Sequence, residues 1–93
     1  MSRLLPPADE VWDIRCVDPK PGIRVLGRFA EKNVFIALTW EIRLLLKCFE
    51  SREWRDAKLR CATAWNHLFL VYPPLMGDYF ADYITDAIFD RDP

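Results

Sequence analysis

Apolar and polar side chains alternate in the first half of the chain, as they do in half-buried β-strands. The alternation covers three stretches, from Val11 to Cys16, from Ile23 to Phe29 and from Val34 to Trp40. Between the first two, Asp18-Pro19-Lys20-Pro21-Gly22 is typical of a turn, because proline fixes φ and glycine accepts unusual φ values. The short link from Ala30 to Asn33 predicts an antiparallel hairpin. Residues 11–40 therefore predict a three-stranded antiparallel β-meander.

The hairpin also predicts which side chains share a face. A turn at Glu31-Lys32 places Phe29 opposite Val34, and a turn at Lys32-Asn33 places it opposite Ile36; both leave the same residues on each face. One face is then apolar, formed by Ile23, Val25, Phe29, Val34, Ile36, Leu38 and Trp40. Arg24 and Arg28 lie on the other face. We expect helices to cover the apolar face.

After Trp40 the spacing of apolar residues becomes that of a helix. A first helix is predicted from Ile42, Leu45, Leu46 and Phe49. A longer one begins after Ser51, a good N-cap, with an apolar stripe formed by Trp54, Cys61, Trp65, Leu68 and Phe69. Pro73-Pro74 ends this main helix, and Asp78 starts a last helix that runs to about Phe89.

Together these elements predict an α+β fold, a three-stranded meander followed by two to three helices packed on one face. A length of 93 residues predicts one domain. Within it we expect an N-terminal arm at residues 1–10, the meander at 11–40 and a helical half at 41–90. The arm is expected because Pro6-Pro7 neither continues a helix nor donates in a sheet.

Charge is nearly balanced overall but unevenly placed. The net charge of −1 gives no general attraction to nucleic acid or anionic membrane. Residues 1–60 carry twelve Lys and Arg against nine Asp and Glu, and residues 61–93 carry one against five. No apolar run is long enough for a signal peptide or a bilayer span. Cys16, Cys48 and Cys61 show no metal-binding spacing, so we expect reduced thiols in a cytoplasmic protein.

Aspartates recur every four residues near the end of the chain, at Asp78, Asp82, Asp86 and Asp90. On a helix they form one row, and like charges at that spacing repel by about 0.2–0.5 kcal/mol per pair. One interpretation is a cap followed by a solvent-exposed face. The other is an acidic strip that docks, with Tyr79 and Tyr83, on a basic surface. That surface belongs either to a partner protein or to the main helix, at Arg52, Arg55, Lys58 and Arg60.

Catalytic and metal-binding patterns are not found in this sequence. His67 is the single histidine and lies near the end of the main helix, without a nucleophile motif or a second metal ligand nearby. Carboxylates along one helix do not converge on a cation as those of a tight loop do. We therefore expect no catalytic residue, no metal and no cofactor.

Three short segments of the meander carry a family resemblance. They are Trp12-Asp13-Ile14-Arg15, Gly22-Ile23-Arg24-Val25-Leu26 and Val34-Phe35-Ile36-Ala37-Leu38. They resemble the central strands of the RelE/HigB/ParE-like toxin superfamily, which typically show E-[LI]-R, y-R-v and an apolar strand. The resemblance covers about a third of the chain. It implies a small α+β fold from phage-like or mobile-element gene neighbourhoods.

The flanking parts differ from that superfamily. Its members usually have a helical hairpin before these strands, where this chain has a short arm, and a basic segment after them, where this chain has Trp40-Glu41-Ile42-Arg43. Of the residues that serve ribonuclease activity in that superfamily, the resemblance assigns only one to this chain, Arg24.

Two functions follow as predictions. The first is a non-enzymatic protein-interaction module, an inhibitor or regulator of phage or mobile-element origin, that docks its acidic helix on a partner protein with a basic surface. The alternative is a degenerate toxin that acts on mRNA or the ribosome through Arg15, Arg24 and Arg28. Nucleic acid is a partner only under the alternative, no membrane is expected, and the oligomeric state is left open.

Overall fold

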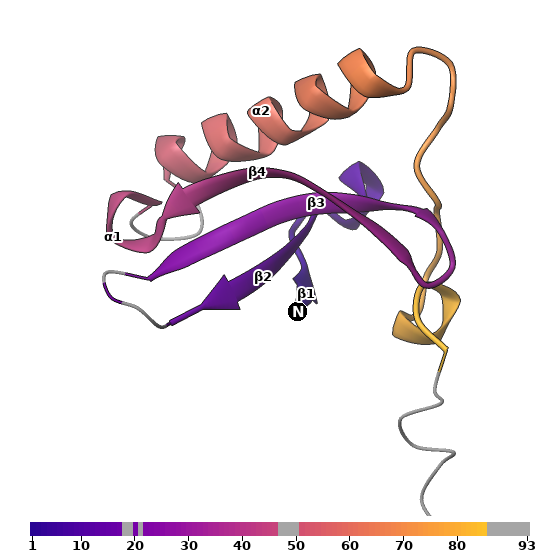
Figure 1. The fold of residues 1–93 in the computed structure, drawn as a ribbon, viewed down its shortest axis with the longest axis horizontal. Helices are drawn as coiled ribbons and strands as arrows, with labels where there is room; N and C mark the ends of the chain where they lie inside the picture. Colours follow the sequence, from indigo (N-terminus) through magenta and orange to yellow (C-terminus); the bar gives the residue numbers. More distant parts are fainter. Residues whose placement is uncertain (18–19, 21, 47–50, 86–93) are drawn as a thin grey trace, which may run out of the picture.

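The computed structural model describes residues 1–17, 20, 22–46 and 51–85 (Figure 1). This part of the chain is α+β, with a four-stranded antiparallel sheet in the order β1-β2-β3-β4. The strands are β1 (Ser2–Arg3), β2 (Trp12–Cys16), β3 (Ile23–Glu31) and β4 (Val34–Ile42). The helices are α1 (Arg43–Leu46) and α2 (Arg52–Leu68), with short 3-10 helices η1 (Pro7–Asp9) and η2 (Phe80–Asp82).

The first ten residues belong to the fold and do not form the expected arm. Ser2 pairs with Asp13, so that β1 adds a fourth strand to the predicted meander. The Leu4 amide donates to the carbonyl of Val11 at 2.8 Å, and the Leu4 side chain is buried. Pro6-Pro7 ends β1 but does not keep the chain away from the sheet, because η1 turns it back towards β2.

The hairpin register differs from both predicted alternatives in its middle part. The turn lies at Lys32-Asn33, as one alternative expected, with Glu31 paired to Val34. An irregularity between Phe29 and Glu31 then pairs Phe29 with Phe35 instead of Ile36, and a second one between Leu26 and Gly27 restores the original register. Between these two points every residue of β4 faces the opposite side from the one expected, because side chains alternate with a period of two.

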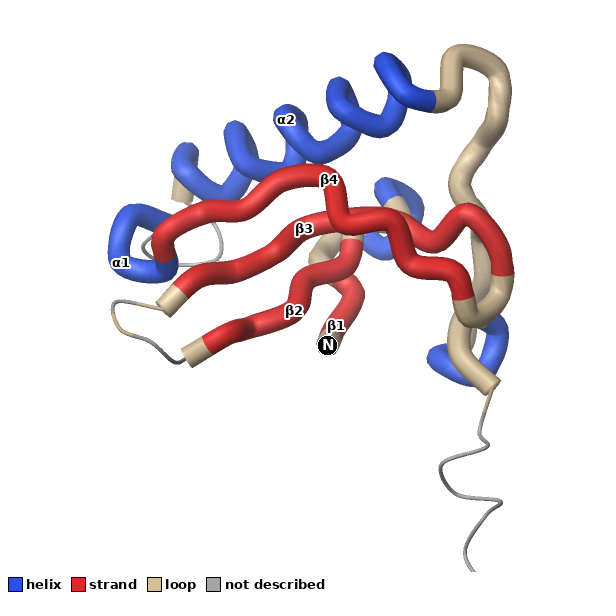
Figure 2. The backbone as a smooth tube through the Cα atoms, viewed as in Figure 1, coloured by secondary structure: helices blue, strands red, loops and turns tan. Residues whose placement is uncertain are grey.

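Helix α2 covers the face of the sheet that we expected to be open. Leu26 of β3 is buried together with Trp54, Ala57 and Cys61 of α2. Leu38, left unpaired by the second irregularity, packs against the same cluster. Figure 2 shows α2 running along β4 and β3. Arg24, Leu26 and Arg28 of β3 therefore point towards α2, because alternate residues of a strand share a face. Ile23 and Val25 point to the other side of the sheet.

The main helix itself is as predicted. Ser51 is its N-cap, and its hydroxyl accepts a hydrogen bond from the Trp54 amide at 3.3 Å, satisfying one otherwise free donor of the first turn. Trp54, Cys61 and Trp65 lie on its buried stripe, whereas Leu68 is exposed. The helix predicted before it is present as the single turn α1, and Ile42 belongs to β4. Phe49 lies outside the described residues.

The predicted last helix is wrong over residues 78–85. This part of the chain contains the single turn η2 and no α-helix. Residues 72–85, here called the C-terminal segment, run past the β3–β4 turn (orange to yellow in Figure 1). The Leu75 amide donates to the carbonyl of Phe29, and the Asn33 amide donates to the carbonyl of Tyr83, both at 2.7 Å. Tyr83 closes a second core with Trp12 and Phe29, so packing against the sheet outweighs helix formation.

Candidate functional site

Two of the four aspartates of the predicted row, Asp78 and Asp82, lie in the described part of the C-terminal segment, and both are exposed. One carboxylate oxygen of Asp82 accepts hydrogen bonds from the amides of Asp78 and Tyr79, both at 2.9 Å. These bonds lower the pKa of Asp82, since they stabilise its ionised form. Asp78 and Tyr79 are exposed, whereas Asp86 and Asp90 lie outside the described residues. Asp82 therefore stabilises its own turn, whereas no such bond of its turn uses the side chain of Asp78.

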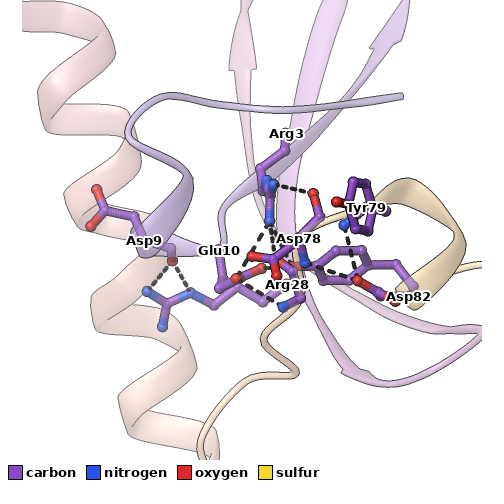
Figure 3. A network of polar contacts seen from close by, with 9 residues as sticks. Arg3, Asp9, Glu10, Arg28, Asp78, Tyr79 and Asp82 are labelled. Atoms are coloured by element: carbon purple, nitrogen blue, oxygen red, sulfur yellow. Dashed lines mark hydrogen bonds and ion pairs between the residues drawn. The ribbon is translucent and has the colours of Figure 1, made fainter.

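Tyr83, expected on the binding surface, is completely buried. Its hydroxyl joins the polar network around Arg3 and Glu10, two residues labelled in Figure 3. Its hydroxyl donates to the carboxylate of Glu10, a residue that is itself 4% exposed. The same hydroxyl accepts from the Arg3 guanidinium at 2.8 Å. Arg3 also donates to the carbonyls of Gly77 and Asp78, at 2.6 and 3.1 Å. The network thus fastens the C-terminal segment to the first ten residues of the chain.

Burial and the neighbouring carboxylate of Glu10 raise the pKa of Tyr83 to about 12, from an ordinary value of 10.0. Because the folded state holds this proton more tightly than the unfolded state, the stability it contributes is fully present below pH 10 and is lost as the pH rises towards 12. We expect a tyrosinate absorbance step at 295 nm near pH 12 that Tyr83→Phe removes. Tyr79→Phe, at an exposed position, is the control and should leave this step in place. A Tyr83→Phe protein with an unchanged step would contradict the assignment.

Two of the three arginines expected to contact RNA lie between the sheet and α2. Arg24 donates to the buried carboxylate of Asp13, and its guanidinium carbon is 5.3 Å from the centre of the Trp54 ring. Arg28 donates to the carbonyl of Asp9 at 2.8 Å. The expectation that both lie on an open basic face is therefore wrong, because α2 packs on their face. Arg15 is exposed.

The opposite side of the sheet presents an apolar surface, here called the open face. Strand pairing aligns its six residues in two rows of three across β2, β3 and β4, formed by Ile14, Val25 and Trp40 and by Cys16, Ile23 and Ile42. None of the six is charged. Trp40 is 62% exposed and the other five are half-buried. The sequence placed Ile23, Val25 and Trp40 on one apolar face, but the expectation that a helix covers that face was wrong.

Cations border one end of the open face. The Arg43 amide donates to the carbonyl of Gly22 at 3.2 Å, which places Arg43 at the start of β3, and Lys20 is exposed in the preceding turn. Val17, Leu44 and Leu45 are exposed apolar side chains of the flanking segments. Among the residues that the structure describes, the centre of this surface is therefore uncharged, and Lys20 and Arg43 lie at one end of it.

The remaining candidate residues take ordinary positions. Cys61 is buried on the sheet-facing side of α2, and burial raises the pKa of its thiol to about 11. Cys16 is half-buried, Cys48 lies outside the described residues, and His67 is exposed in the last turn of α2. Within the described ranges, no three His, Cys, Asp or Glu side chains come together as metal ligands. None of the helices in this part of the chain combines the length and the apolar character needed to cross a bilayer.

Comparison with protein-family models, with curated proteins and with solved structures gave no match to this chain. The resemblance to the RelE/HigB/ParE-like toxins therefore stays a prediction.

Proposed function

We propose that this chain is a small protein-interaction module, without a catalytic role, whose open face packs against a partner protein. The observation that supports this most directly is the six uncharged residues on one side of the sheet, with Trp40 62% exposed, while α2 occupies the other side. A contiguous apolar patch of this kind is typical of protein-binding surfaces, and tryptophan is often a residue that dominates binding energy.

The border of the open face determines the chemistry of the partner. A surface that covers Val25 and Trp40 is apolar at its centre, because a charge placed there would lose its water without gaining an ion pair. Lys20 and Arg43 then favour carboxylates at one edge of the partner. We propose an apolar partner surface with an acidic edge, in the cytoplasm, on which the chain acts as an inhibitor or regulator.

Docking on a basic partner surface is a separate proposal with less support. Among the described residues it depends on Asp78 and Tyr79, because Asp82 is bonded within its own turn and Tyr83 is buried. The toxin alternative has less support still. It needs arginines that reach a phosphate backbone, and Arg24 and Arg28 contact Asp13 and Asp9 beneath α2.

Site-specific photocrosslinking in cells tests the open face. A benzophenone side chain at position 40 should give one discrete crosslinked partner, and the same group at Leu70, which is 87% exposed but not part of the open face, should not. The partner is then purified and its affinity measured. Trp40→Asp should weaken binding by roughly 30-fold, about 2 kcal/mol, since it removes a central aromatic contact and adds a buried charge.

Leu70→Asp is the matched control, because it adds the same charge at an exposed apolar position elsewhere. Equal weakening by both variants would show that charge alone, and not the open face, governs binding. A crosslinked product made of two copies of this chain would show that the open face mediates self-association and does not bind a different protein. A partner bound equally well by Trp40→Asp and lost on Asp78→Lys would favour the acidic docking proposal instead.

A further inference from the structure

A cleft of about 550 Å³ lies between residues 2–6, here called the N-terminal segment, and the start of α2. Its apolar lining is formed by Leu4, Leu5, Pro6 and Trp54. This volume is within the range of pockets that enclose small molecules. The cleft shares no residue with the open face, so any ligand bound there is independent of the proposed protein contact.

The charged residues that line this cleft are all cations. They are Arg3, Arg55 and Lys58, and no carboxylate belongs to the lining. Glu10 lies 3.5 Å from Arg3 and offsets part of that charge. Arg55 and Lys58 are three residues apart on α2, so their side chains are neighbours on its surface. The Lys58 ammonium donates to the carbonyl of Leu5 at 2.5 Å, which holds it across the cleft between helix and N-terminal segment.

A neighbouring cleft of about 440 Å³ provides a comparison within the same molecule. It shares Pro6, Arg55 and Lys58 with the first cleft, but its lining also includes Asp9. An anion placed there would lie near a carboxylate. The first cleft therefore differs from its neighbour in having cations and no carboxylate in its lining.

We propose that the first cleft binds a small amphiphilic carboxylate. Its apolar part packs against Leu4, Pro6 and Trp54, and its carboxylate lies between Arg55 and Lys58. Apolar burial favours a ligand with several carbon atoms, at about 25 cal/mol for each Å² removed from water. Charge-assisted hydrogen bonds to the two cations select a carboxylate over an alcohol or an amine of the same length.

Calorimetric titration of the full-length chain with octanoate tests this proposal. Octanoate should bind at least tenfold more tightly than octylammonium, which carries the opposite charge, and than acetate, which lacks the apolar chain. Arg55→Gln and Lys58→Gln should each weaken octanoate binding by roughly tenfold, since each removes one charge-assisted hydrogen bond. Circular dichroism shows whether each variant is folded.

Arg52→Gln is the matched control, because Arg52 is an exposed cation of the same helix that lines neither cleft. It should bind octanoate as the natural chain does, and so should Trp40→Asp, which separates this site from the open face. Equal binding of octanoate and octylammonium, or unchanged binding by folded Arg55→Gln and Lys58→Gln, would overturn the proposal. If a peptide with a free C-terminal carboxylate binds far more tightly than octanoate, the ligand of this cleft is a peptide and not a small molecule.

Discussion

Asp13→Ala is expected to lower the free energy of unfolding by about 3 kcal/mol, because it leaves the charge of Arg24 beneath α2 without its carboxylate. Asp13 is 2% exposed, and its carboxylate accepts from Arg24 and from the Ser2 hydroxyl, the latter at 2.9 Å. The Arg24 side chain is 16% exposed, so the expected loss of unfolding free energy is at the lower end of the range for fully buried pairs.

Urea unfolding followed by tryptophan fluorescence measures this loss, and a loss of this size lowers the Tm of a domain of this length by more than about 10 °C. Arg15→Ala is the matched control. Arg15 lies on the same face of the sheet, opposite Arg24 in the β2–β3 pairing, but is exposed, so its removal should change stability by less than about 0.5 kcal/mol. A stable Asp13→Ala protein would contradict the burial of this pair.

The double variant Asp13→Leu/Arg24→Met separates the two contributions to this loss. Replacing both charges by apolar side chains removes the guanidinium together with the carboxylate, so most of the stability lost in Asp13→Ala should return. Arg24 acts here as a structural residue between sheet and helix. Because its guanidinium is engaged in this way, Arg24 is a poor candidate for contact with RNA.

Local sequence signals predicted the main helix and the strands well. Ser51 caps α2, and the stripe through Trp54, Cys61 and Trp65 faces the sheet, because capping and helical periodicity depend only on nearby residues. The three long strands also lie close to the predicted stretches, although β3 and β4 each extend two residues further. β1 was missed because two residues are too short for alternation to be recognised.

The faces of the sheet could not be predicted by the same means. The side that α2 covers carries Arg24 and Arg28, and the sequence alone made that side look exposed. Arg24 is accommodated there by Asp13 and the ring of Trp54, two contacts between residues distant in sequence. Apolar patterning therefore placed Ile23, Val25 and Trp40 on one face, but it predicted that helices cover this face and did not mark it as a binding surface.

The acidic end illustrates the same limit for a predicted site. Asp78 as a cap and the apolar spacing after it predicted a helix from Asp78 onward, yet Tyr83 packs into the core with Trp12 and Phe29 and bonds to Glu10. The last contact joins residues 73 positions apart. The cleft beside α2 was missed for a related reason, because its cations are far apart in the sequence, with Arg3 on one side and Arg55 and Lys58 on the other.

Gly27→Ala is the second substitution expected to have a large effect, a loss of about 3 kcal/mol. Gly27 is buried in β3, between Trp12 of β2 and Ala37 of β4. A Cβ added at this position would overlap the carbonyl oxygen of Ile36 and lie 2.6 Å from Cζ of Phe35. The carbonyl belongs to the β4 backbone, so relief requires moving one strand away from the other at the place where the register changes.

Gly77→Ala is the control, because its added Cβ would lie 2.7 Å from the exposed side chain of Asp82 and not against a strand. We expect this variant to lose less stability than Gly27→Ala in the same urea titration. The comparison also tests the hairpin register, since the overlap at Gly27 arises in the register in which Phe29 pairs with Phe35 and Gly27 with Ala37. A Gly27→Ala protein as stable as the natural chain would mean that the register does not change there, and Ile36 and Leu38 would then return to the face originally expected for them.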